Sequence, residues 1–193
     1  MRLNRVLMVT ALVLAAQVAM AEVYTFQPTP ADIYDLDHHK AYRWGIDTSI
    51  PDCEDVIGAS IFFDDIRNWD GGTNDLWVTL LDTAPAGLTV YCDSQGGGDK
   101  FYGWGPRLVH YHNLPTSPQD ITYTFDAAEV AALDSYVADD NVGLGFDPDC
   151  HYWNEGITLT IETESHCVPI PEPMAGSILL GGIGMIVARR KRR

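Results

Sequence analysis

Basic residues are scarce in this chain of 193 residues, and most of them stand at its two ends. Residues 22–173 contain all 27 acidic residues but only five basic ones, which gives this segment a net charge of −22. A field of that sign repels polyanions and attracts cations. The composition therefore argues against nucleic acid as a partner and favours a cation as a ligand.

Motifs of the common enzyme classes are also absent. The sequence has no Gly-x-Ser-x-Gly motif, no glycine-rich phosphate loop and no Cys-x-x-Cys pair. The acidic pairs at 64–65 and 139–140 are adjacent residues, and adjacent side chains of a strand point to opposite faces. Neither pair makes a general acid and base by itself, so the sequence favours a protein that is not an enzyme.

The start of the chain has the composition of a secretory signal peptide. Arg2 and Arg5 precede an apolar run over residues 6–16, and Ala19-Met20-Ala21 supplies the small residues of a signal-peptidase site. We expect residues 1–21 to be removed and the rest to be exported. The alternative is an uncut membrane anchor, for which the apolar run is short.

The end of the chain combines a proline-rich spacer, an apolar run and a basic tail. Three prolines fall within residues 168–173, residues 174–188 carry no charge, and residues 189–193 are all basic. Fifteen helical residues reach about 22 Å, against a hydrocarbon core of about 30 Å. Flanking residues and snorkelling arginines can cover the difference. We expect a short transmembrane helix with its basic tail in the cytoplasm.

This arrangement around Pro171, Glu172 and Pro173 resembles the PEP-CTERM sorting signal. The resemblance covers residues 168–193 and implies an exosortase-type transpeptidase as a partner. The precursor would be held in the membrane, cut near the Pro-Glu-Pro motif, and passed to the cell surface or the extracellular matrix of a Gram-negative-type bacterium. The alternative is a plain tail anchor behind a proline-rich linker.

The exported part has the pattern of an all-β protein. Short runs rich in aromatic and β-branched residues are separated by turn clusters. The predicted strands are 41–47, 56–66, 76–82, 87–92, 101–112, 121–125, 142–146 and 157–163. Residues 121–125 and 157–163 alternate apolar and polar side chains, as half-buried antiparallel strands do. We expect a jelly-roll-like β-sandwich over residues 41–167, preceded by a linker and first edge segment over 22–40.

One helix is predicted, over residues 127–138. Asp126 stands at the N-cap position and Glu129 three residues later, which is the spacing of a capping box. Val130, Leu133 and Val137 form a narrow apolar stripe on one face.

Three acidic loops are candidates for a structural Ca²⁺ site, because Ca²⁺ takes six to eight oxygen ligands. One loop spans residues 93–99, and the others lie near residues 35–37 and 147–155. We expect the last two to meet, because the first and last strands of a jelly roll are commonly neighbours. The candidate ligands are Asp147, Asp149, Asn154, Glu155, Asp35 and Asp37. The alternative is a set of solvated turns.

Two further groups are open to more than one interpretation. Four cysteines allow three pairings, of which we favour Cys53–Cys150 with Cys92–Cys167. That choice assumes that the first and last strands run antiparallel to each other. His110 and His112 share one face of a predicted strand and suit a transition metal, but no third ligand is evident in the sequence.

The aromatic residues near the predicted loops are also open to two interpretations. Tyr102 and Trp104, and likewise Tyr152 and Trp153, lie in or beside predicted loops, where flat rings can stack on sugars; the alternative is burial in the sandwich. We therefore expect an exported, non-catalytic surface or matrix protein with a structural, adhesive or glycan-contacting role. The alternative is a secreted carbohydrate-active enzyme that uses distant carboxylates.

Overall fold

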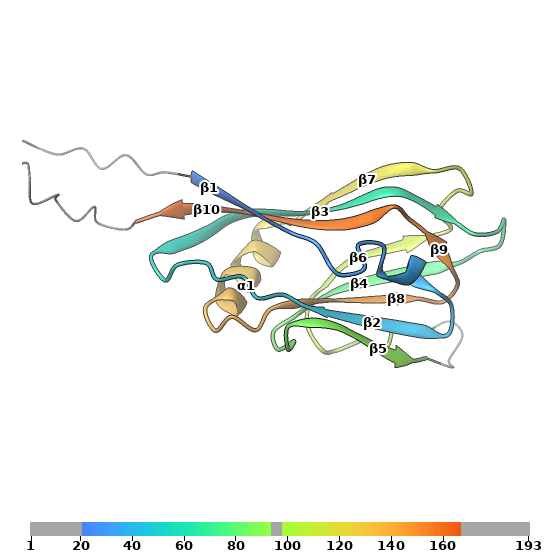
Figure 1. Cartoon of the computed structure of the whole chain (residues 1–193), viewed down its shortest axis with the longest axis horizontal. Coiled ribbons are helices and arrows are strands. Elements are labelled where there is room, and N and C mark those ends of the chain that lie inside the picture. The colour runs from blue at the N-terminus through green and yellow to red at the C-terminus, as the bar shows by residue number, and fades with distance from the viewer. Residues whose placement is uncertain (1–20, 94–97, 167–193) are drawn as a thin grey trace, which may run out of the picture.

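The computed structural model describes residues 21–93 and 98–166 of the chain (Figure 1). Two antiparallel sheets stack face to face, and the described residues contain one α-helix. This confirms the predicted all-β sandwich with one short helix. The predicted signal peptide and sorting signal lie outside the described residues. Within the described residues, no helix is both long and apolar enough to span a membrane.

Each sheet is built from strands that are far apart in the sequence. The first sheet has the order β1-β10-β3-β7, and β9 pairs with the far end of β3. The second has the order β5-β2-β8-β4-β6. The strand bounds in the first sheet are β1 Ala21–Phe26, β3 Glu54–Asn68, β7 Gln119–Thr124, β9 Tyr152–Trp153 and β10 Gly156–Ser165. Those in the second are β2 Lys40–Gly45, β4 Asp75–Leu81, β5 Gly87–Cys92, β6 Arg107–His112 and β8 Gly143–Pro148.

The core lies between the sheets and follows the predicted alternation. Ile157, Leu159 and Ile161 of β10 are buried, whereas the threonines between them are only partly buried. They pack in one cluster with side chains from the facing sheet such as Leu144 and Phe146 of β8. Each such side chain stabilises the fold by roughly 1.5–3 kcal/mol relative to an exposed position.

Helix α1 (Ala127–Val137) begins as its sequence predicts. The carboxylate of Asp126 accepts hydrogen bonds from the backbone N–H groups of Ala128 and Glu129, and the Glu129 carboxylate accepts one from Asp126 N–H. The two residues thereby satisfy donors that a helix start leaves unpaired. Asp134 then accepts a hydrogen bond from the backbone N–H of Val56, which fixes the helix to the start of β3.

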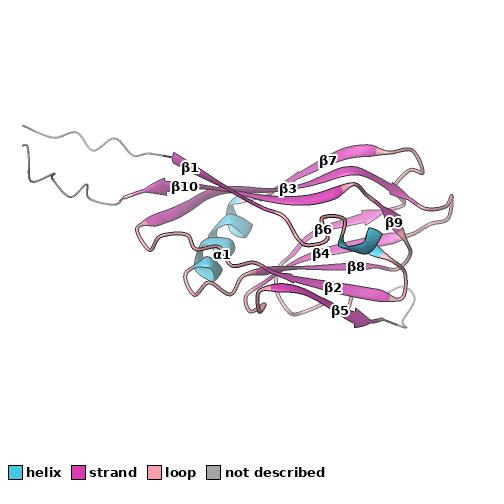
Figure 2. Ribbon diagram, in the orientation of Figure 1, coloured by secondary structure: helices cyan, strands magenta, loops and turns pink. Residues whose placement is uncertain are grey.

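The sandwich has two different ends (Figure 2). Ala21 of β1 lies opposite Glu164 of β10, so the described chain enters and leaves at the same end, which we call the proximal end. Helix α1 lies toward this end. The opposite, distal end carries the starts of β2, β4 and β7 and the ends of β3, β5, β6 and β8. Loops that are remote in the sequence therefore meet at the distal end.

The expected disulfide pairing is wrong. Cys92 and Cys150 are free thiols, which excludes both Cys53–Cys150 and Cys92–Cys167, whereas Cys53 is disulfide-bonded. The assumption behind the pairing fails, because the predicted first strand, residues 41–47, is β2, and β2 and β10 belong to different sheets. Cys53 precedes β3 at the proximal end, and Cys150 follows β8 at the distal end. Cys167 lies outside the described residues.

The close approach of the β4–β5 connection to β2 gives a test of this packing. A Cβ atom at Gly45 would lie 1.9 Å from the backbone oxygen of Pro85. We expect Gly45→Ala to destabilise the domain by about 1–3 kcal/mol or more, because backbone rather than a flexible side chain must move. Gly71→Ala is the matched control, since nothing lies within 4 Å of the added atom. Equal urea midpoints for the two variants would contradict this packing.

Candidate functional site

The distal end gathers the described histidine and carboxylate groups that could hold a metal ion. Among the described residues, three sets of histidine and carboxylate groups have ligand atoms within 4.8 Å of one another. All three come from loops and strand ends at the distal end. They are Asp37 with His38 and His151, Asp75 with His110 and His112, and Asp64 with Asp65 and Asp120.

An exposed aromatic surface lies where β3 continues beyond β7 and pairs with β9. Arg67 pairs with Trp153 and Asn68 with Tyr152, and the N–H of Trp69 donates to the backbone oxygen of His151 at 3.2 Å. Alternate residues of a strand face the same side. Tyr152 and Asn68 are accordingly buried, whereas Trp69 and Trp153 are 53% and 40% exposed. We call Trp69, His151 and Trp153 the aromatic platform.

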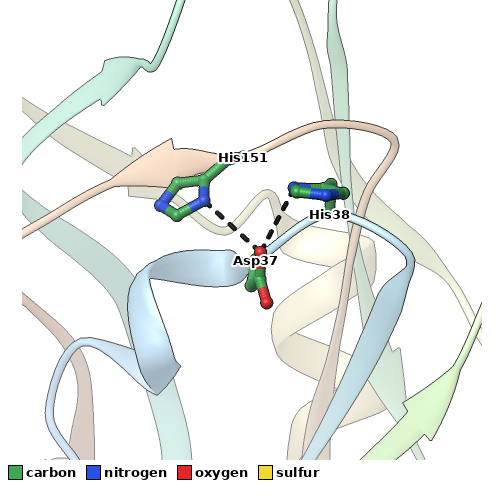
Figure 3. Close-up of side chains that lie close together, drawn as sticks. All are labelled: Asp37, His38 and His151. Carbon is green, nitrogen blue, oxygen red and sulfur yellow. Dashed lines mark ion pairs between the residues drawn. The ribbon is translucent and has the colours of Figure 1, made fainter.

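The platform is bordered by a carboxylate from the segment before β2 (Figure 3). Asp37 Oδ1 lies 3.2 Å from Nδ1 of His38 and 3.4 Å from Nδ1 of His151. Its other oxygen accepts a hydrogen bond from Lys40 Nζ at 2.8 Å. This hydrogen bond from Lys40 holds the pKa of Asp37 below its usual value, despite some burial. Asp37 is therefore an anion at neutral pH. The His151 ring also contacts Trp153, with ring centroids 4.5 Å apart.

The structure brings together the two segments expected to share a cation. Besides the contact between Asp37 and His151, Asp35 accepts a hydrogen bond from the N–H of Asn154 at 3.4 Å. The side chains of the six candidate ligands nevertheless point in different directions. Asn154 donates to the backbone oxygen of Asp32, and Glu155 is exposed. Asp149 accepts a hydrogen bond from the N–H of Asp75 at 2.6 Å.

Asp147 lies near other carboxylates, those of Asp93 and Asp99. It is 1% exposed, its Oδ2 accepts a hydrogen bond from the N–H of Lys100, and its Oδ1 has no partner. Burial, together with the nearby carboxylates of Asp93 and Asp99, raises the pKa of Asp147 to about 7. The hydrogen bond that Asp147 accepts from the N–H of Lys100 lowers this pKa. A small pocket of about 200 Å³ beside it is lined by Asp93, Gly98, Asp99 and Lys100.

Sequence reasoning missed the partner of the histidine pair. Asp75 of β4 pairs with His112 of β6, and its Oδ1 lies 2.6 Å from His110 Nε2 and 2.7 Å from His112 Nδ1. Burial raises the pKa of Asp75, but the hydrogen bonds to His112 and His110 outweigh it and hold the pKa below its usual value. Only the register of β4 against β6 reveals this third group.

A second aromatic surface lies on the outer face of the second sheet. Tyr102 is exposed, and Trp104 is 51% exposed. Tyr102 lines a pocket of about 430 Å³ together with Arg107 and Asp99. Arg107 lies over the Tyr102 ring, 5.9 Å from its centroid, and forms an ion pair with Asp99 at 2.8 Å. Of the four rings that the sequence left open between exposure and burial, Tyr102, Trp104 and Trp153 are exposed, whereas Tyr152 is fully buried.

Comparisons with known proteins add no family to this picture. No protein-family model matches the chain, and no curated protein has a significantly similar sequence.

The buried carboxyl of Asp147 predicts a dependence of stability on pH. Its pKa in the folded protein is about 7, above the ordinary value of 3.8 that the unfolded chain retains. Between these pH values the folded state binds more protons than the unfolded state. The contribution of Asp147 to the free energy of unfolding is therefore fully present below about pH 4 and is lost as the pH rises through 7. In EDTA, the urea midpoint should fall between pH 5 and pH 8. Asp147→Asn should remove most of this fall, because the amide can stay uncharged and donate to Asp93.

Two controls sharpen this experiment. Glu155→Gln removes an exposed carboxylate at the same end and should leave the pH profile of the wild type unchanged. Adding millimolar CaCl₂ at pH 8 tests whether Asp147 binds a structural Ca²⁺. If it does, Ca²⁺ at a hundredfold excess over Kd would stabilise the wild type by about 2.7 kcal/mol and would not stabilise Asp147→Asn. Identical pH profiles for the wild type and Asp147→Asn would refute the raised pKa.

Proposed function

We propose that this protein is an exported, non-catalytic β-sandwich that a PEP-CTERM-type signal sorts to the cell surface or extracellular matrix, and that its aromatic platform contacts glycans. The observation that carries the proposal is the division of the molecule into two ends. The chain leaves the sandwich at the proximal end, and the platform lies at the distal end. A tether through the sorting signal would follow β10 and would leave the platform facing outward.

The chemistry of the platform suits a sugar. Trp69 and Trp153 offer exposed aromatic faces, against which the apolar C–H face of a pyranose ring can pack. The ionised Asp37 at its border can accept hydrogen bonds from sugar hydroxyl groups, and Lys40 is held beside it as a donor. Apolar rings with a few polar groups at their edge are the usual composition of a small-ligand site.

The order of the strands supports the finer fold assignment. We propose a jelly roll, because β1-β10-β3-β7 and β2-β8-β4-β6 alternate strands from the two halves of the domain, with β5 added at the edge beside β2. Jelly rolls are common in carbohydrate-binding and surface proteins, and fold alone does not fix function.

The alternative, a secreted carbohydrate-active enzyme, receives less support. Such an enzyme needs two carboxyl groups about 5–10 Å apart on either side of a bound glycosidic bond. Among the described carboxyl groups, Asp147 is the one with a pKa raised to about 7, as a general acid would need, but it is 1% exposed. A buried carboxyl cannot reach the glycosidic oxygen of a polysaccharide.

The sorting part of the proposal predicts the fate of the precursor. Replacing Pro171, Glu172 and Pro173 by alanine should leave the precursor uncut and held in the membrane, because the extended recognition spacer is lost. Fractionation and immunoblotting of the native host measure this. Thr116→Ala with Ser117→Ala, in an exposed loop of the domain, should be processed normally. Normal processing of the alanine-substituted motif would refute the exosortase assignment.

The glycan part predicts a loss confined to the platform. Trp153→Ala and Trp69→Ala should each weaken retention on the polysaccharide that the wild type binds by about tenfold, as expected when one aromatic contact is lost. Trp104→Ala, which removes an equally exposed ring from the second aromatic surface, should bind as the wild type does. Loss of binding in Trp104→Ala alone would place the glycan on the other surface. Release of sugar from the same polysaccharides would establish the enzyme instead.

A further inference from the structure

We propose that Asp75, His110 and His112 form a binding site for a transition-metal dication such as Zn²⁺, open to solvent at the edge of the second sheet. The proposal does not depend on glycan binding, because the aromatic platform is made by different residues on the other sheet. It rests on the arrangement of two strands, on the support behind His110 and Asp75, and on the charges around the three side chains.

The pairing of β4 with β6 directs the three groups toward one point. His110 and His112 are two residues apart on β6 and therefore face the same side, and Asp75 lies directly opposite His112. Asp75 Oδ1 is 2.6 Å from His110 Nε2 and 2.7 Å from His112 Nδ1. Two ligands of a tetrahedral Zn²⁺ are about 3.4 Å apart at the usual bond lengths. A small rotation of these accessible side chains makes room for the ion.

Two neighbouring groups hold the ligands in place. The indole of Trp77 stacks on the His110 ring with an interplanar angle of 13° and ring centroids 5.1 Å apart, which fixes the plane of the imidazole. Asp149 accepts the hydrogen bond from Asp75 N–H, which fixes the backbone at the start of β4. Ligands on rigid strands with such support lose little freedom when they bind a metal.

The ligand types select the class of metal. Two imidazole nitrogens and one carboxylate oxygen suit Zn²⁺, Cu²⁺, Ni²⁺ or Co²⁺, whereas Ca²⁺ and Mg²⁺ prefer oxygen ligands alone. Three protein ligands leave at least one coordination position open. Because β6 is an edge strand, that position is open to water or to an oxygen of a second molecule.

The surrounding charge favours this site over the similar set at Asp37. Asp37 already forms an ion pair with Lys40 at 2.8 Å, and this ammonium group repels a dication. Among the described residues, no lysine or arginine forms an ion pair with Asp75; its carboxylate contacts His110 and His112, and Asp149 adds a carboxylate beside it. The Asp37 set has the same residue types and carries this cation, so it serves as a control for the Asp75 set.

Isothermal titration of the exported protein with Zn²⁺, purified without a polyhistidine tag, tests the proposal. The wild type should bind one ion with an affinity that falls at least tenfold in His110→Gln, in His112→Gln and in Asp75→Asn. His151→Gln and His38→Gln should bind as the wild type does. Titration with Co²⁺ should give the visible absorption bands of a nitrogen-ligated ion, and His110→Gln should lose them.

Three outcomes would overturn the proposal: no binding by the wild type, unchanged affinity in His110→Gln, or loss of binding in His151→Gln alone. Thermal unfolding in EDTA controls for damage to the fold. All variants should unfold within a few degrees of the wild type, because the ligands are not part of the core. If Asp75→Asn unfolds early, the two histidine variants, which keep the carboxylate and its backbone support, decide the result.

Discussion

The hydrogen-bonded ladder between β3 and β10 is the interaction on which the rest of the structure depends. Strand β10 lies between β1 and β3, so it connects the first strand of the domain to the sheet. Strand β3 pairs along its 15 residues with β10, β7 and β9 and is fixed to the helix through Asp134. An irregularity in its pairing with β7, where Asp65 has a φ of 49°, lies between Phe63 and Ile66. Beyond it the strand turns to β9 and supports the aromatic platform.

What the sequence predicts well is what short stretches of chain determine. The capping box at Asp126 and Glu129 fixes the helix start, and the alternation over residues 157–163 fixes which side chains of β10 face the core. Pairing between strands was not predictable in this way, because it depends on contacts between residues many positions apart. The expected cysteine pairs failed for this reason. Asp75 went unrecognised as the third member of the histidine set because only the register of two strands brings it there.

The acidity of the domain also has a structural explanation. At the distal end, many carboxylates accept hydrogen bonds from backbone N–H groups of loops and strand starts, where no neighbouring strand supplies an acceptor. The carboxylates of Asp149, Asp147 and Asp99 accept hydrogen bonds from the backbone N–H groups of Asp75, Lys100 and Phe101, respectively. In the same way, Asp120 accepts from the N–H of Asp65, and Asp70 accepts from the N–H of Gly72. Aspartate suits such turns because its short side chain reaches nearby backbone groups. The negative field that would attract cations is therefore partly a by-product of how the loops are built.

The position of the proximal and distal ends of the sandwich determines how the domain would carry a mechanical load. A pull between a tether that follows β10 and a ligand held at the distal end would run parallel to β10 and β3. Load that enters through Trp69 must cross from β3 to β10. Their ladder pairs Gly156 with Asp64 at one end and Ser165 with Glu54 at the other, so this load would shear many backbone hydrogen bonds together. A pull on both chain ends would instead open β1 from β10 one residue pair at a time, starting at Ala21 and Glu164. The same fold is thus strong along the first direction and weak along the second.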